Sequence, residues 1–212
     1  MISIRKLDHN DRADVRRIAC ETAFLGESLA SCFDDDEILA DALTLYFTDY
    51  EPDSCLVAVD EDRVVGYVTG AKNSATMRRV FRAKVMPRLF RKAVLTGTCF
   101  RPKAWRFLFH VMMSFLRGEF CTPDVSREYP ATLHINVDAR FRGTKVGTQL
   151  MDRYLGFLKS EAVPGVHVNT MSERARSFFQ KQGFGLLAEG KRTFLRYCLR
   201  RDLPFYILGK RL

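Results

Sequence analysis

The sequence predicts a mixed α+β fold. Segments with the two-residue alternation of strands are interleaved with segments that have the 3.6-residue period of amphipathic helices. The 212 residues, 47% of them hydrophobic, are enough for one sizeable core. No repeat, low-complexity tract or linker divides the chain, so we expect one domain over residues 1–212.

The first third of the chain predicts one strand, two helices and a hairpin. The alternating "ISIRKL" indicates a strand, and the following segment indicates a helix with Asp11 as its N-cap. One face of that helix would contain Val15, Ile18 and Ala19. A second helix is expected at about 35–47. The segment "DSCLVAVDEDRVVGYVTGA" predicts two strands joined by a tight acidic turn.

The middle of the chain is a basic block. Residues 67–118 contain 12 Lys and Arg and no Asp or Glu, whereas the whole chain has a net charge of +9. Helical periodicity appears in two pieces, at about 75–95 and 103–117, with Gly97 and Pro102 between them. We therefore expect a hairpin of two helices within residues 71–118, each with one face buried and an outer face of positive potential.

The function of this basic block is left open by its pattern. Its apolar members, spaced for amphipathic helices, are Val80, Phe81, Val85, Leu89, Phe90, Trp105, Phe107, Phe109 and Phe115. The block is consistent with a cover over an acceptor cleft that attracts acidic acceptors. It is equally consistent with peripheral contact with an anionic membrane or a nucleic acid, or with a solvated face over an apolar core.

The last third predicts two strands that each lead into a helix, followed by a tail. The strands are "ATLHINV" and "GVHVNTM". The first is followed by a helix over about 145–160, with Val146, Leu150, Tyr154 and Phe157 on one face. The second is followed by "SERARSFFQKQGF", a helix with Ser172 as N-cap and Gly183 as its stop. The tail contains two more strand-like runs, "TFLRYCL" and "FYILGKRL".

The turn between Val137 and the next helix has the composition of an anion site. A helix N-terminus presents unpaired N–H groups and a partial positive charge, and an open one can bind a phosphate. In "RGTKVG", Gly143 lacks a Cβ where backbone amides would approach an anion, and Arg142 adds a permanent charge. Gly147 costs the helix about 1 kcal/mol relative to alanine, which suggests close packing there. An ordinary strand–turn–helix connection remains the alternative.

These residues resemble the Q/R-x-x-G-x-G/A motif of the GNAT superfamily of N-acetyltransferases. "LHINVDARFRG" resembles the family's fourth strand and loop, and "SERARSFFQKQGF" its later helix. "YFTDYEP", "YPATLHI" and "PGVHV" are similar to bacterial relatives of the acetyltransferase-like domain found in O-GlcNAcases. The resemblance implies a three-layer α+β fold with a central mixed, mostly antiparallel sheet flanked by helices. The basic block would be a helical insertion between the third and fourth strands.

The resemblance also implies acetyl-CoA, or another acyl-CoA, as co-substrate. The pantetheine arm would pair with the backbone of the strand at Ile135–Val137, and the pyrophosphate would bind the turn amides. The implied cofactor contacts are Ile135, Val137, Arg142, Gly143, Thr144, Lys145, Val146, Gly147, Thr148, Ser172 and Phe178. Lys145 stands where the motif has glycine; it suits a helical conformation with its side chain pointing outward.

The catalytic groups are less evident. The family's usual acid, a tyrosine, is replaced by Phe179, and the strand before the loop has no glutamate. His134 and Asn136 share one face of that strand, and His134 has an intrinsic pKa suited to a base. A backbone N–H near Val137 would stabilise the oxyanion. Further candidates, each with a structural alternative, are His167, Tyr129, Asp49 and Glu51.

The sequence therefore favours an N-acetyltransferase acting on an unknown amine, with a non-catalytic acetyl-CoA-binding or interaction module as the alternative. No apolar run is long enough to span a bilayer, and "MISIRKLDHNDRADV" contains no signal-peptide core. The six cysteines are widely spaced. We therefore expect reduced thiols in a cytoplasmic protein, without a metal site, rather than disulfides.

Overall fold

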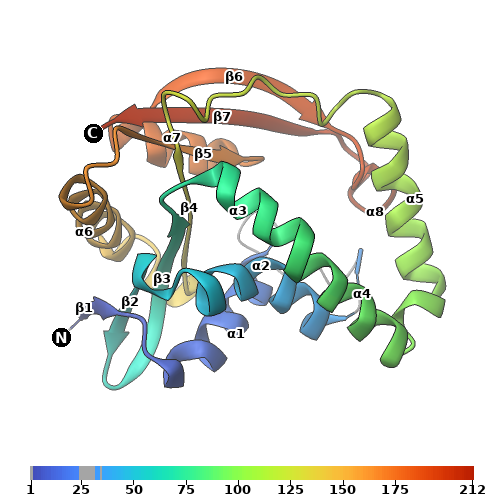
Figure 1. Cartoon of the computed structure of the whole chain (residues 1–212), viewed down its shortest axis with the longest axis horizontal. Helices are drawn as coiled ribbons and strands as arrows, with labels where there is room; N and C mark the ends of the chain where they lie inside the picture. The colour runs from blue at the N-terminus through green and yellow to red at the C-terminus, as the bar shows by residue number, and fades with distance from the viewer. Residues whose placement is uncertain (1, 24–31, 34) are drawn as a thin grey trace.

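The computed structural model describes residues 2–23, 32–33 and 35–212, and it contains one mixed sheet with helices on both faces (Figure 1). The strands are β1 (Ser3–Lys6), β2 (Cys55–Asp60), β3 (Arg63–Ala71), β4 (Ala131–Val137), β5 (Gly165–Thr170), β6 (Gly185–Arg192) and β7 (Leu203–Arg211). The α-helices are α1 (Arg12–Thr22), α2 (Asp36–Tyr50), α3 (Ser74–Val80), α4 (Met86–Leu95), α5 (Pro102–Leu116), α6 (Val146–Ser160), α7 (Glu173–Lys181) and α8 (Arg196–Leu199).

The strand order is β1-β2-β3-β4-β5-β7-β6, and β4–β5 is the parallel pair in it. The predicted mixed, mostly antiparallel sheet is thereby confirmed. The acidic turn between β2 and β3 was also predicted correctly. Glu61 and Asp62 both have positive φ, at 47° and 65°, as the tight turns of two-residue hairpins require.

Helix α6 packs on one face of the sheet through the residues that its periodicity predicted. Val146, Leu150 and Tyr154 are buried at 1%, 0% and 0% exposure, and Phe157 packs against the same core. The approach is close at Gly70 of β3, where a Cβ would lie 1.9 Å from the Tyr154 hydroxyl oxygen. Gly70 therefore permits this helix to seat a tyrosine directly on the strand.

Helices α1 and α2 cover the other face. Val15, Ile18 and Ala19 are fully buried there, as predicted. Asp11 occupies the N-cap position of α1, as predicted, but its side chain makes no cap bond to this helix. Asp8 instead caps the short 3-10 turn before the helix, and Asp11 accepts bonds from Arg5 at 2.6 Å and from the Asp8 amide.

The segment between β3 and β4 contains the two predicted helical pieces. The first runs from α3 through a π-helical turn, Phe81–Val85, into α4, and the second is α5. The expected burial of an apolar face was wrong for several residues named at the sequence level. Phe90, Trp105, Phe109 and Phe115 are 60–68% exposed.

The tail differs from expectation. "FYILGKRL" belongs to β7, but "TFLRYCL" is not a strand; it forms a turn and the short helix α8. The strand beside β7 is instead β6, in the segment "GLLAEGKR". That segment has few apolar residues because β6 is an edge strand of the sheet, so its alternation signal is weak.

Two of the six cysteines form a disulfide, which corrects the expectation of reduced thiols throughout. Cys32, before α2, is bonded to Cys198 of α8, 166 residues later in the sequence. The bond lies in a small apolar cluster with Leu195 and Leu203. It joins the segment before α2 to the segment between β6 and β7. Cys20, Cys55, Cys99 and Cys121 are free thiols.

Reduction of Cys32–Cys198 should destabilise the fold. A cross-link that closes so long a loop typically contributes about 2–4 kcal/mol, which for this chain length corresponds to a fall in Tm of about 5–15 °C. Thermal unfolding with and without reductant measures it. Cys198→Ser should reproduce the fall in Tm and abolish the effect of reductant. Cys121→Ser, at an exposed free thiol, should retain both the wild-type Tm and the dependence of Tm on reductant. An unchanged Tm for Cys198→Ser would contradict the prediction.

Candidate active site

Strands β4 and β5 separate partway along their length. They pair at Ala131–Val166 and Thr132–His167 and no further. The Asp138 amide donates to Val65 of β3 at 2.9 Å. Because antiparallel pairs alternate, the backbone groups of Ile135 and Val137 then point away from β3, towards the gap that β5 has left. This part of β4 is paired with β3 on one side and has no strand partner on the side that faces β5.

The turn after β4 leads into the N-terminus of α6. Lys145 is the N-cap residue and has no side-chain cap bond, and its side chain is exposed. Its φ is +68°, which contradicts the helical conformation expected for it. Lys145 adopts the left-handed conformation for which the family motif uses glycine, and Gly143 nearby has a φ of +87°. Left-handed residues are a feature of anion-binding loops, although in this turn the Arg142 and Thr144 amides donate to the carbonyls of Ala139 and Phe141, both at 3.4 Å.

The surroundings of this turn fit a bound anion. The Arg142 Nε donates to the Val137 carbonyl at 3.4 Å, which places the guanidinium at the end of β4. At Gly147 a Cβ would lie 3.7 Å from both Phe178 and Val137, an ordinary contact distance. Close packing within the protein therefore does not require this glycine, and the space beside it is open to a ligand.

Helix α7 lies beside this turn. Ser172 is its N-cap, as predicted, and its hydroxyl accepts from the Ala175 amide at 3.3 Å. Phe178 faces Gly147, whereas Phe179 is 3% exposed and packs in the core against Phe184. The side chain at the position of the family's usual acid is thus buried and apolar.

His134 lies on the face of β4 that α2 covers. Its ring packs edge-on against Phe47 with the centroids 5.6 Å apart, and it is paired across the strands with Thr69. The side chain is exposed, but desolvation by the surrounding protein still lowers the pKa of His134 from its ordinary value. At neutral pH the imidazole is therefore uncharged, which is the state that a general base requires.

Asn136 is on the same face and is held by a partner that the sequence did not indicate. Its Nδ2 donates at 2.8 Å to the hydroxyl of Tyr67, which is directly opposite on β3. Tyr67 is 3% exposed, and burial raises its pKa, so it remains a phenol. Pairing the predicted hairpin with the predicted fourth strand could have suggested Tyr67. No pattern in the sequence indicated that Phe47 would contact His134.

The other sequence candidates have structural roles. His167 is buried, with Nδ1 2.7 Å from the carbonyl of Tyr129. The Tyr129 ring lies against Gly165 and Gly209, at the paired end of β5. Asp49 forms ion pairs with Arg12 and Arg88, at 2.6 and 3.3 Å.

Glu51 is likewise structural. Its carboxylate accepts from the Tyr46 hydroxyl at 2.8 Å, the Ser54 hydroxyl at 3.1 Å and the Lys72 amide at 2.8 Å. The carboxylate thus ties α2 to the end of β3.

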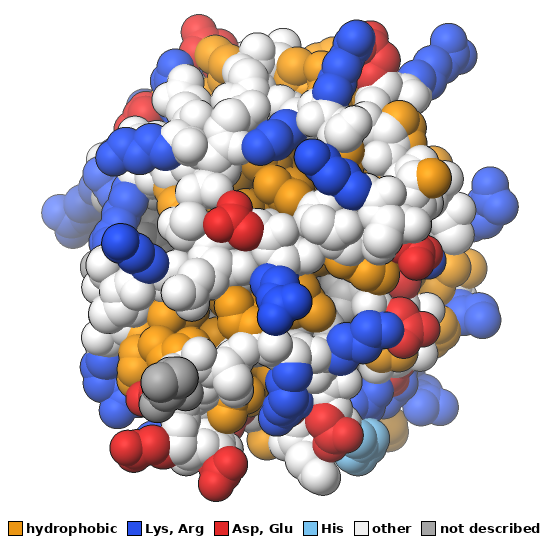
Figure 2. Space-filling view, turned by 90° about the vertical axis from the view of Figure 1, so that its left-hand side faces the viewer, with side chains coloured by type: hydrophobic (Ala, Val, Ile, Leu, Met, Phe, Trp, Pro, Cys, Tyr) orange, Lys and Arg blue, Asp and Glu red, His pale blue; other side chains and the backbone are white. Residues whose placement is uncertain are grey.

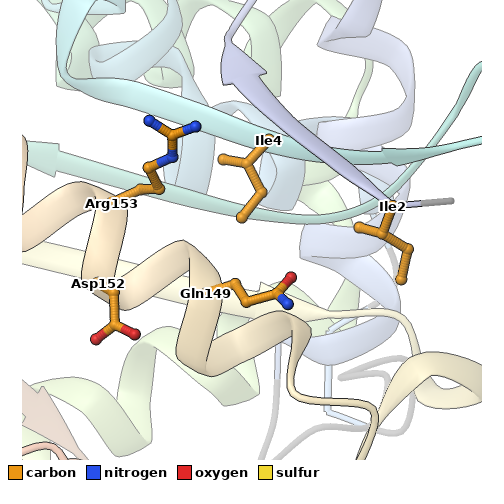
Figure 3. A pocket seen from close by; sticks show the side chains of 5 residues that line it. All are labelled: Ile2, Ile4, Gln149, Asp152 and Arg153. Carbon is orange, nitrogen blue, oxygen red and sulfur yellow. The ribbon is translucent and has the colours of Figure 1, made fainter.

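A cavity of about 440 Å³ lies between β1 and α6. Figure 3 shows its lining of Ile2 and Ile4 opposite Gln149, Asp152 and Arg153. It opens on the side of the molecule that carries α6 and β1, where hydrophobic atoms lie between scattered Lys and Arg side chains (Figure 2). The cavity adjoins the candidate turn, because Gln149 directly follows Thr148 in the first turn of α6, whereas His134 is on the opposite face of the sheet.

Comparison with known proteins agrees with this geometry. Residues 111–184 match the acetyltransferase (GNAT) family. The structure titled SsHAT has a TM-score of 0.75 at 24% identity, covering 99% of this chain and 98% of that one. The polyamine N-acetyltransferase of Drosophila melanogaster has a TM-score of 0.64 at 20% identity, with full coverage of both chains. A putative acetyltransferase from Salmonella typhimurium, solved with acetyl-CoA, has a TM-score of 0.60 at 15% identity, covering 100% and 94%.

The family match coincides with the candidate site. The matched segment contains β4, the open turn, α6 and α7, which are the elements that form the candidate site. The match covers residues 111–184, about a third of the chain, so this segment is similar to the GNAT family, and the solved structures show that the whole chain shares their fold.

Proposed function

We propose that this protein transfers the acetyl group of acetyl-CoA to an amine held beside His134 and Asn136. The observation that carries the proposal is the uncapped N-terminus of α6, which opens where β4 and β5 separate. An anion on this helix end and an extended arm in the gap would place the reacting end of the donor near β4.

The groups proposed to hold acetyl-CoA come from both sides of the turn. The backbone of Ile135 and Val137 would pair with the pantetheine arm, and the amides from Arg142 to Thr148 would hold the pyrophosphate. Arg142 and the exposed Lys145 add positive charge at the same place, and Ser172 and Phe178 border it from α7. When bound, acetyl-CoA supplies the activated acetyl thioester.

His134 is the proposed base, with Asn136 as a positioning residue. A neutral imidazole can accept a proton from the ammonium form of the acceptor, and the exposed ring is accessible to it. The Tyr67 hydroxyl fixes the Asn136 amide on the same face. The Val137 N–H, directed into the gap, is the proposed donor to the developing oxyanion.

The insertion is proposed as a cover over the acceptor side. The α3–α4 piece packs on α2, with Lys92 2.7 Å from Asp41. Helix α5 packs against the segment that follows β6, where Ser114 Oγ lies 3.2 Å from Thr193 Oγ1. The two pieces thus rest on opposite sides of the gap within one proposed domain over residues 1–212. Their positive charge would favour an acceptor with acidic groups.

One observation favours the alternative of a non-catalytic acetyl-CoA-binding or interaction module. Phe179 has no hydroxyl and is buried, so α7 offers no acid to the leaving thiolate at that position. In the catalytic proposal the thiolate leaves unassisted or takes its proton from water or another residue.

A cytoplasmic location remains part of the proposal, on the condition that the compartment is not strongly reducing. Among the described helices, none has the length and hydrophobicity to cross a bilayer. The Cys32–Cys198 disulfide, however, would not persist in a strongly reducing compartment.

The similarity to bacterial relatives of the O-GlcNAcase-associated domain also remains a prediction.

Turnover of acetyl-CoA with a panel of amines tests the proposal. Release of the CoA thiol should depend on the amine and produce the acetylated amine by mass spectrometry. The panel should contain polyamines, amino sugars and acidic peptides. Tight acetyl-CoA binding without turnover on any amine would favour the non-catalytic module. Absence of acetyl-CoA binding would overturn both.

A further inference from the structure

The hairpin of α4 and α5 exposes an unusual number of large apolar side chains. Eleven of the fourteen large hydrophobic residues that are exposed in the described part of the chain lie within 86–116. They are Met86, Phe90, Val94, Leu95, Phe100, Trp105, Leu108, Phe109, Met112, Phe115 and Leu116. A patch of this kind marks an interaction site in a stable protein.

The exposed residues of α5 form a continuous stripe. Trp105, Leu108, Met112 and Phe115 recur at helical spacing, and each is 54–65% exposed. The opposite face is already occupied: Ala104 and Ser114 are buried, and the Phe107 ring lies 6.3 Å from that of Phe194. Helix α5 is therefore apolar on both sides, and the fold uses only one of them.

The tip of the hairpin continues this surface. Leu95 and Phe100, on either side of the turn between α4 and α5, are 79% and 76% exposed. Thr98 between them is buried and donates to Asp35, which fixes the tip to the start of α2. Figure 1 shows α4 and α5 meeting at the right-hand edge of the molecule, far from α6.

The charges carried by the hairpin itself have one sign, and two of them, Arg88 and Lys92, are paired with acidic residues of α2. Residues 67–118 contain 12 Lys and Arg and no acid, and Arg82, Arg91 and Arg106 are exposed beside the apolar residues. Aromatic and aliphatic residues framed by Lys and Arg are the composition of helices that lie in the interface of anionic membranes. A second copy of the chain would bring two such basic surfaces together, which like-charge repulsion disfavours.

We propose that the α4–α5 hairpin docks on an anionic lipid bilayer, with the tip and the α5 stripe inserted between headgroups. The occupant is the lipid surface itself, and the chain remains on one side of it. Docking of this kind does not depend on which amine the protein acetylates.

The protein carries its own reporter for this test. Trp105, on the stripe and 62% exposed, is the single tryptophan of the chain. Its emission should shift to shorter wavelength on addition of phosphatidylcholine vesicles containing about one quarter phosphatidylserine, and the protein should float with them. Neutral phosphatidylcholine vesicles should bind at least about tenfold more weakly. Unchanged emission and no flotation would overturn the proposal.

Two variants, one double and one single, locate the surface. The double variant Leu108→Glu with Met112→Glu should reduce binding to anionic vesicles at least about tenfold, since both side chains are solvent-exposed and the fold does not depend on them. Leu186→Glu, at an exposed leucine on β6, should bind as the wild type does. Equal binding by both variants would place the docking surface elsewhere. Self-association or RNA binding through the stripe, without vesicle binding, would assign it to another partner.

Discussion

Gly147→Asp should abolish acetyl-CoA binding while leaving the fold intact. The new carboxylate would stand in the first turn of α6, where the pyrophosphate is proposed to lie. Two unit charges about 4 Å apart repel by roughly 4 kcal/mol at the effective dielectric of a protein surface, which corresponds to about a thousandfold weaker binding. Isothermal titration calorimetry with acetyl-CoA measures the change, and unchanged affinity would reject this site.

The chain offers a close control for this variant. Gly156 lies on the exposed face of the same helix, and a Cβ there would meet nothing within 4 Å. Gly156→Asp should retain wild-type affinity. Since a carboxylate near a helix N-terminus is favourable by about 0.3–1 kcal/mol, Gly147→Asp should unfold at the wild-type temperature or slightly above it. A large fall in Tm would show instead that the loss of binding reflects misfolding.

His134→Ala should lower kcat by about 10²–10⁴ with little change in acetyl-CoA affinity. The expectation rests on a neutral, accessible imidazole on the face of β4 beside Asn136. Steady-state kinetics with an accepted amine measures it. His9→Ala, at an exposed histidine outside the site, should keep full activity. Full activity in His134→Ala would remove this residue from the mechanism.

The pH profile separates a base from a structural histidine. Desolvation lowers the pKa of His134 from its ordinary value, so the imidazole is deprotonated and active at neutral pH. The wild-type kcat/KM should therefore rise with pH below about 6.5 and level off above it. In His134→Ala this rising limb should disappear, and added imidazole should restore part of the rate. A wild-type limb retained in the variant would assign the titration to another group.

Much of the fold could be predicted because its signals are local. Alternation and helical spacing predicted the strands around the site and the buried face of α6. The glycines and Arg142 after Val137 indicated an anion-binding turn, and Ser172 was predicted correctly as a cap. These features depend on residues within about one turn of one another, where side-chain chemistry and backbone geometry are directly linked.

The features that only the tertiary structure decided depend on residues far apart in the sequence. The Cys32–Cys198 disulfide needs two loops to meet across 166 residues, and the Asn136–Tyr67 hydrogen bond needs the register of β3 and β4. Helical spacing identified the apolar residues of α5. It did not show that the face with Trp105 would remain exposed, because burial depends on which other elements arrive. The left-handed Lys145 follows the same rule: the path between β4 and α6 sets its φ, and its side chain does not.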